Sequence, residues 1–158
     1  RMQGVKRGLP YGYSLWEMEV YATVKETAEY GVVSKNKIAT TSGTETEAMA
    51  AANAFDGDEG TRWSSNFADD AWIAVDLGKT YAIDKVVLNW EAAYGKAYKI
   101  QTSTDGNNWT TVKDLTNQDG GEDTITFNAV NARYVRMQGV TRALPYGYSL
   151  WEMSVYTK

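Results

Sequence analysis

The densest group of side chains able to do chemistry lies in one short stretch, residues 53–63. Asp56, Asp58 and Thr61 place oxygen donors close together, with intervening glycines that permit a sharp turn. Hard oxygen donors around a tight turn suit Ca2+, although the spacing lacks the terminal bidentate glutamate of an EF-hand loop. A plain Asx-type turn uses the same residue types, so spacing alone leaves both interpretations open.

Two further carboxylates lie beside aromatic residues. Glu91 follows Trp90 at the expected end of a strand, where it could accept hydrogen bonds from sugar hydroxyls or pair with an amine. A solvated charge at a strand end is the simpler alternative. Glu152 alternates with Trp151 and Met153, so we expect it on the opposite face from them, as a metal ligand or as a surface charge.

Aromatic residues in loops are the third group of candidates. Phe67 lies in a polar loop with no obvious core face, and loop residues of this kind are often used in binding. Tyr146 and Tyr148 flank a glycine, so one ring can face outward as a sugar platform while the other packs inward. Packing of both rings is the alternative.

The composition narrows the possible chemistry. The 158 residues include no cysteine and no histidine, which excludes disulfides, thiol catalysis, the usual general base and the commonest zinc ligand. The net charge of −4 argues against nucleic acid as a partner. No apolar run is long enough to span a membrane. Paired carboxylates can hydrolyse glycosides, but a unit this small without long loops favours binding over catalysis.

The sequence pattern around these residues indicates short strands separated by turns, which predicts an all-β sandwich. Alternating apolar residues place the strands at 71–77, 83–91, 98–102 and 109–115, then around 125–127, 135–139 and 151–155. A short strand at 30–33 and a short helix at 48–55 are also expected.

The N-terminal segment repeats the C-terminal one. Residues 1–21 match residues 136–156 at 18 of 21 positions. A repeat of this length is typical of tandem modules, and linked modules gain avidity. We therefore expect residues 1–21 to be the end of a preceding module, 22–35 a connector and 36–158 one complete module. Alternatively, residues 1–21 are a spacer, or they exchange with a neighbouring chain.

Residues 36–158 carry six motifs, in order: DGxxxTRW (56–63), WIxVDLG (72–78), VVLNWE (86–91), YKIQxSxDGxxW (98–109), ARYVRM (132–137) and YGYSLWE (146–152). Together they resemble the discoidin, or coagulation factor V/VIII C-type, superfamily, and within it the bacterial family 32 carbohydrate-binding modules. The resemblance implies an eight-stranded, galactose-binding-like jelly-roll β-sandwich without catalytic activity.

The resemblance also implies a structural Ca2+ near the start of the domain. Its ligands, matched by position, would be the Asn53 carbonyl and the side chains of Asp56, Asp58, Thr61 and Glu152.

A sugar site in the loops at one end of the sandwich is implied as well. The sequence is most similar to the chitosan-binding modules of secreted chitosanase/glucanase enzymes. The candidate positions are Glu45, Arg62, Phe67, Glu91, Tyr94 and Tyr146. Phe67 departs from the tyrosine of that pattern, so a hydroxyl contact would be missing. The absence of a loop histidine disfavours galactose.

The predicted partner is thus an oligo- or polysaccharide of glucosamine or glucose, either chitosan or a related β-glucan. Glu45 and Glu91 could pair with the amines of chitosan while rings stack on the sugars. The resemblance implies a secreted protein attached to a polysaccharide-degrading enzyme, and the repeat implies adjacent modules of the same parent. The alternative is a discoidin-type adhesion module for a cell-surface protein, another glycan or a membrane, which the acidic balance disfavours.

Overall fold

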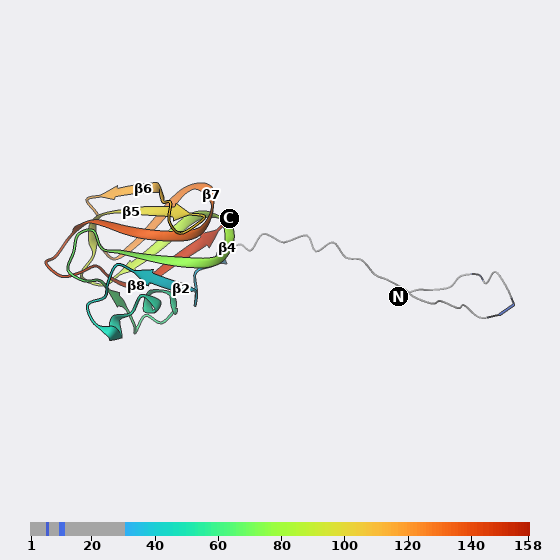
Figure 1. The fold of residues 1–158 in the computed structure, drawn as a ribbon, viewed down its shortest axis with the longest axis horizontal. Helices are drawn as coiled ribbons and strands as arrows, with labels where there is room; N and C mark the ends of the chain where they lie inside the picture. The colour runs from blue at the N-terminus through green and yellow to red at the C-terminus, as the bar shows by residue number, and fades with distance from the viewer. Residues whose placement is uncertain (1–5, 7–9, 12–30) are drawn as a thin grey trace.

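The computed structural model describes residues 6, 10, 11 and 31–158 (Figure 1). The predicted module end at 1–21 therefore lies outside the described residues except at these three positions, as does the connector before residue 31. Two short 3-10 helices and eight strands make up the described part. The strands are β1 Gly31–Val32, β2 Ile38–Thr41, β3 Trp63–Ser64, β4 Trp72–Trp90, β5 Gly95–Ser103, β6 Thr110–Thr116, β7 Glu122–Arg142 and β8 Ser149–Thr157.

Two long strands hold the architecture together. The strands follow the order β1-β8-β4-β7-β5-β6, while β2 pairs with β4 and β3 pairs with β8. The first part of β4, from Trp72 to Asp76, pairs with β2 and with the second half of β7. The later part, from Ile83 onward, pairs with β8 and with the first half of β7. The sheet therefore folds over itself into two layers, which is the predicted β-sandwich (Figure 1).

The core lies between these layers and confirms the predicted alternation. Side chains of period two along β4, β5 and β7 are fully buried, among them Ile73, Val75, Leu77, Val86, Leu88, Tyr98, Ile100, Val135 and Met137. One buried face per strand fixes the pairing register, because a slip of one residue would expose the whole apolar set.

Three expectations about the elements need correction. The strands expected at 71–77 and 83–91 are one continuous β4, and those at 125–127 and 135–139 are one β7. The expected helix is a pair of 3-10 turns, η1 Glu47–Met49 and η2 Ala51–Phe55. None of the described helices has the length and apolarity needed to cross a membrane.

Trp151 does not share the buried face of Met153, as the alternation in the strand expected at 151–155 had indicated, and Leu150 is buried instead. The register of β4 and β8 shifts between the pairs Asn89/Glu152 and Trp90/Leu150, so Trp151 is the extra residue of a bulge. Trp151 is only half-buried, whereas Leu150 has no exposed surface. A bulge re-aims the neighbouring side chains, and this one lies next to the candidate ligand Glu152.

The folded unit also begins earlier than the expected boundary at residue 36. Gly31 and Val32 pair with Thr157 and Tyr156 of β8. Ser34 is buried, and its hydroxyl bonds the backbone of Met153 and Val155.

Candidate functional site

Loops from separate parts of the chain meet where β4 ends and β8 begins, at the pole of the sandwich opposite the C-terminus (Figure 1). Glu45 follows β2, Arg62 immediately precedes β3, and Glu91 is the first residue after β4. Tyr146 lies in the loop from β7 to β8. Backbone bonds fix these loops to one another, since Glu45 N donates to the Ser64 carbonyl and Glu91 N to that of Ser149.

These loops enclose a pocket of about 290 Å³. Four of the six predicted sugar residues line it, and the complete lining is Glu45, Arg62, Ser64, Glu91, Ala92, Ala93, Leu144 and Tyr146. The pocket thus combines two carboxylates, one guanidinium and one phenol ring with the apolar side chains of two alanines and a leucine. A few convergent polar groups in a concave site are typical of small-ligand binding.

Local hydrogen bonds orient the charged groups. Ser64 Oγ donates to Glu45 Oε2 over 2.8 Å, and the Ala93 N–H donates to Glu91 Oε2 over 3.2 Å. Arg62 Nη1 donates to Ser149 Oγ over 2.6 Å. Within the described part of the chain, no hydrogen bond occupies the second oxygen of either carboxylate. Each therefore keeps an acceptor available to a ligand.

An aromatic rim borders the pocket. The rings of Phe67 and Tyr146 meet edge to face, with centroids 6.2 Å apart and an interplanar angle of 82°. Both are well exposed, at 54% and 58%, and Leu144 beside them is 41% exposed. Exposed rings at the edge of a polar pocket offer stacking surfaces. Leu144 was missed by the sequence reasoning, although a leucine in a polar loop was a usable signal.

The Tyr146 loop is anchored from beneath. Arg142 bonds the Asp69 carboxylate over 2.8 Å and the carbonyls of Pro145 and Tyr146. The Arg142 bonds hold the pKa of Asp69 below its usual range. Of the two tyrosines that flank Gly147, Tyr146 is exposed and Tyr148 is fully buried, which is the first of the two predicted arrangements. The Tyr148 hydroxyl donates to the Asp69 carbonyl over 2.7 Å. Burial, then the Asp69 charge, raises the pKa of Tyr148.

Tyr94 is not brought into the pocket. Its ring packs beneath Gly120, where an added Cβ would lie 2.8 Å from the ring, and it also contacts the core cluster. The sequence suggested proximity because Tyr94 follows Glu91 closely, but Tyr94 is not among the residues that line the pocket. Tyr94 therefore supports the turn rather than lining the pocket.

A partly buried network next to Glu91 was not anticipated. Asp123 Oδ2 accepts hydrogen bonds from Trp90 Nε1 over 2.8 Å and from the Tyr98 hydroxyl over 2.5 Å. The Trp90 and Tyr98 rings also meet edge to face at 5.3 Å. This network fixes the end of β4 and hence the position of Glu91. Burial raises the pKa of Tyr98, with Asp123 adding to the effect.

The predicted calcium residues form a tight turn closed by β8. Asp56 accepts bonds from Asp58 N over 2.8 Å and from Thr61 Oγ1 over 2.7 Å. Glu152 Oε1 accepts from Gly57 N over 2.5 Å, which brings a residue 95 positions away to the loop. Burial, together with the nearby Asp56 charge, raises the pKa of Glu152. Asn53 closes the other side, where its amide donates to the carbonyls of Ala48 and Arg62.

This donor set fits Ca2+ in part. Among residues 31–158, no three acidic side chains converge closely enough to hold a metal by themselves. A cation here would therefore need carbonyl and hydroxyl oxygens besides carboxylates, and that mixture is the one calcium accepts. Asp56 and Glu152 also lie close enough for their charges to interact, and the amine of Lys35 lies against Gly57 in the same loop.

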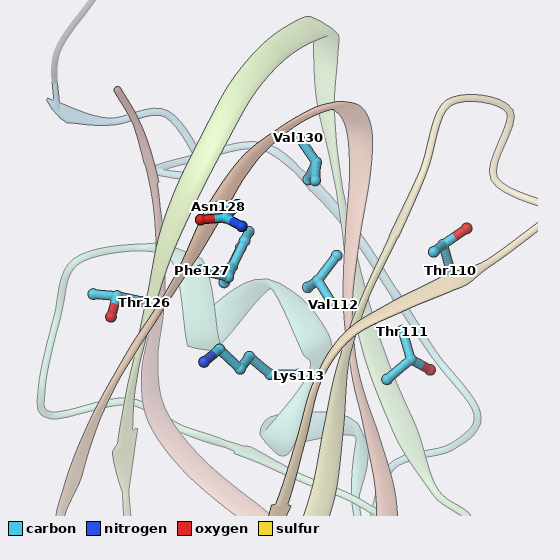
Figure 2. Close-up of a pocket in the computed structure, with 8 residues that line it drawn as sticks. All are labelled: Thr110, Thr111, Val112, Lys113, Thr126, Phe127, Asn128 and Val130. Atoms are coloured by element: carbon cyan, nitrogen blue, oxygen red, sulfur yellow. The ribbon is translucent and has the colours of Figure 1, made fainter.

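A second, larger groove of about 700 Å³ opens between β6 and the first half of β7 (Figure 2). Figure 2 shows Val112, Phe127 and Lys113 reaching into the space between the two strands. Lys113 is the single charged residue in its lining, and none of the predicted site residues lies there. An amine-bearing ligand would be repelled at this groove, whereas the polar loops supply carboxylates.

Comparisons with known proteins agree with this fold. A chitosan-binding module 1 from a chitosanase/glucanase of Paenibacillus sp. IK-5 is 50% identical, with a TM-score of 0.77 over 79% of this chain and 98% of that one. Module 2 of the same enzyme, solved with chitotriose, is 48% identical, with a TM-score of 0.77 over 78% and 98%. A galactose-bound family 32 module of Clostridium perfringens NanJ is 20% identical and shares the fold, with a TM-score of 0.70.

One curated relative also matches. The polysaccharide lyase 8 family protein HylA of Enterococcus faecalis is 41% identical over 88 residues, which are 54% of this chain and 6% of that protein. The chain thus corresponds to a small part of that relative. The family model of the F5/8 type C domain matches residues 37–153, nearly the whole sandwich. The chain therefore belongs to the F5/8 type C, or discoidin, domain family.

Proposed function

We propose that this chain is a non-catalytic carbohydrate-binding module whose ligand is chitosan or a related β-glucan. The observation that carries the proposal is the loop pocket in which Glu45, Arg62, Glu91 and Tyr146 converge. The likeness to two chitosan-binding modules, at 50% and 48% identity, supports it.

The charge of the pocket favours a glucosamine polymer over a neutral glucan. Two carboxylates and one guanidinium leave a net charge of −1 in the lining. The unoccupied oxygens of Glu45 and Glu91 can accept charge-assisted hydrogen bonds from sugar ammonium groups, which are stronger than neutral ones. Tyr146 and Phe67 supply rings for the apolar face of a pyranose.

A neutral β-glucan is the second candidate within the same site. Arg62 can donate to sugar hydroxyls, and stacking on Tyr146 needs no charge on the ligand. Phe67 offers a ring without a hydroxyl, so selectivity between glycans would depend on the two carboxylates.

We further propose that Asn53, Asp56, Asp58, Thr61 and Glu152 hold a structural Ca2+. Bound there, the ion would neutralise the Asp56 and Glu152 charges and tie the 53–63 loop to β8. Since β8 continues from the Tyr146 loop, the ion would stabilise the sugar site without contacting the sugar.

The biological setting follows from the same proposal. A module of this kind brings a polysaccharide-degrading enzyme to its substrate, so we infer an extracellular protein. The shallow pocket predicts weak binding by each module, which adjacent modules in the same parent would offset through avidity.

The test is calorimetric titration of the intact chain with chitotriose, laminaritriose and cellotriose. We expect binding of chitotriose to exceed that of the neutral sugars, and Tyr146→Ala to abolish it. Asp114→Asn is a control, because this exposed residue of β6 pairs with Lys99 and does not line the pocket. Wild-type affinity in Tyr146→Ala would overturn the site. If the protein sediments with liposomes and binds none of the sugars, the adhesion alternative would be favoured.

A further inference from the structure

One arginine on the outer face of the sandwich stacks against two tryptophans. Trp72 of β4 and Arg136 of β7 alternate with buried core residues, so both point away from the core. The guanidinium carbon of Arg136 lies 4.2 Å from the ring centroid of Trp109, just before β6, and 5.6 Å from that of Trp72. Three separate parts of the chain thus bring one cation and two indole rings together.

Gln101 of β5 orients the guanidinium. It lies opposite Arg136 in the register of β5 and β7, and its Oε1 accepts hydrogen bonds from Arg136 Nε over 2.9 Å and Nη2 over 2.6 Å. Gln101 Nε2 in turn donates to Thr111 Oγ1 over 3.1 Å. A guanidinium has five N–H donors, and the Arg136 side chain makes no other hydrogen bond within the described part of the chain. Donors of Arg136 therefore remain available to a ligand. We call Trp72, Gln101, Trp109 and Arg136 the lateral cluster.

Arg136 differs from the other arginines of the described fold because no carboxylate lies near it. Arg133 and Arg142 each pair with an aspartate, and Arg62 shares its pocket with two glutamates. Among residues 31–158, no acidic side chain lies within ion-pair distance of Arg136. Burial lowers the pKa of Arg136, as expected for a partly desolvated cation. The lateral cluster therefore holds a cation without a counterion, in a chain whose net charge is −4.

The chemistry of the lateral cluster suits a sugar that carries a carboxylate. Trp72, Trp109 and Arg136 are each half-buried, so each keeps surface open to solvent. The C–H face of a pyranose stacks on an aromatic ring, and a guanidinium binds a carboxylate through charge-assisted hydrogen bonds in a planar geometry. Partial burial also reduces the screening of such an ion pair by solvent. A uronic acid unit would satisfy both the rings and the cation.

The charge of the lateral cluster distinguishes it from the loop pocket. The pocket lining has a net charge of −1, and its carboxylates would repel a uronate. Arg136 would repel a glucosamine ammonium group in the same way. Single-stranded nucleic acid also combines stacking faces with negative charge, but its affinity depends on the neutralisation of several phosphates. One arginine on an acidic chain does not supply that, so the observations favour an acidic glycan.

We propose that the lateral cluster is a second glycan site, which binds a uronic acid unit of an acidic polysaccharide. Arg136 binds the carboxylate, Trp72 and Trp109 contact the sugar, and Gln101 holds the guanidinium in position. The module then has two sites of opposite charge preference, one at the pole and one on the outer face. The inference does not depend on what the loop pocket binds.

The test is an NMR titration of the intact chain with trigalacturonate, with cellotriose as the uncharged counterpart. The chain has six tryptophans, and Trp72→Phe and Trp109→Phe identify the two indole N–H signals of the lateral cluster. We expect trigalacturonate to shift these two signals and that of Arg136 Nε–H, with a weaker effect at high salt. Absence of these shifts would overturn the proposal. Equal shifts with cellotriose would also overturn it, because the carboxylate would then have no role.

Arginine variants test the role of the charge. Arg136→Gln should weaken trigalacturonate binding about tenfold, as expected when charge-assisted hydrogen bonds are lost. Arg133→Gln is the matched control, because it changes the net charge equally but removes a guanidinium that is already paired with an aspartate. It should bind like wild type, as should the loop-pocket variant Tyr146→Ala. Wild-type affinity in Arg136→Gln, or an equal loss in Arg133→Gln, would overturn the proposal.

A second variant keeps the test decisive if Arg136→Gln does not fold. Arg136→Lys keeps the positive charge but lacks the planar fork that Gln101 holds. Chitotriose binding at the loop pocket and the dispersion of the NMR spectrum report whether each variant is folded. We expect a folded Arg136→Lys to bind trigalacturonate more weakly than wild type, and unchanged affinity would overturn the proposed geometry. Shifts of the same indole signals by a thymidine oligonucleotide, without any by trigalacturonate, would overturn the glycan proposal in favour of nucleic acid.

Discussion

Replacing the two pocket carboxylates by amides distinguishes a site that binds the ammonium groups of the sugar from one that binds sugars by stacking alone. Glu45→Gln and Glu91→Gln keep an acceptor for the bonds from Ser64 and from the Ala93 N–H. Each substitution removes the negative charge and replaces one of the two accepting oxygens by an NH2 group. The fold and the aromatic rim should therefore be unchanged.

The magnitude follows from exposure. A hydrogen bond to a charged group contributes about 1.5–3 kcal/mol and a neutral one about 0.5–1.5 kcal/mol, so each substitution costs about 1 kcal/mol when the group is shielded. Glu91 is half-buried, whereas Glu45 is exposed, and solvent screening reduces its share to about 0.5 kcal/mol. The double variant then loses about 1.5 kcal/mol, or roughly tenfold in the dissociation constant for chitotriose.

The assay is titration with chitotriose and with neutral cellotriose at low and at high salt. We expect the loss for chitotriose alone, larger for Glu91→Gln than for Glu45→Gln, and smaller at high salt. An equal loss of affinity for cellotriose would show that the carboxylates bind sugar hydroxyls. Unchanged chitotriose binding in the double variant would refute the reasoning.

Four further outcomes are expected. Phe67→Ala should weaken oligosaccharide binding by about 1 kcal/mol, since it removes one of two stacking rings; titration measures this, and an unchanged affinity would leave the rim without a role. Asp123→Ala should lower the free energy of unfolding in urea by about 2 kcal/mol, because two buried donors lose their acceptor, whereas Asp123→Asn should recover part of it. Removal of calcium with EGTA should lower the melting temperature of the wild type, and Glu152→Gln should reduce that response; a melting curve insensitive to EGTA and to added calcium would contradict the calcium proposal. Bonds from Arg133 lower the pKa of Asp76, so this carboxylate stabilises the fold above its unfolded pKa of about 3.9, and the stability is lost as pH falls through the lower folded value. Acid titration of the unfolding free energy should be shallower in Asp76→Asn, and an identical acid limb would argue against this contribution.

The ordered motifs and the apolar alternation were sufficient to predict the sandwich and most of its core. They did not reveal that two pairs of expected strands are continuous, as in β4 and β7. Alternation reports one buried face per segment, and it does not record whether the chain between two segments bends or continues. The misplacement of Trp151 has a similar origin, since a bulge changes the phase of alternation without a composition signal.

For the pocket, the sequence supplied the residue types and the tertiary structure supplied their proximity. Glu45, Arg62, Glu91 and Tyr146 converge because β2, β3, β4 and β8 all have an end at the same pole. Tyr94, close to Glu91 in sequence, does not line the pocket and packs against Gly120. Nothing local distinguishes these cases, because the direction of a loop side chain depends on the turn that precedes it.

The sequence by itself determined the strand periodicity, the acidic and aromatic character of the loops, and the 18 of 21 identities between the two copies of the C-terminal segment. These are properties of residue type and order, which need no coordinates. Only the tertiary structure decided that β8 lies beside β4, how Glu152 reaches the loop at Asp56, and that Asp123 bonds the Trp90 ring next to Glu91. Those facts depend on contacts between residues far apart in the chain, and such contacts are fixed by packing of the whole sandwich.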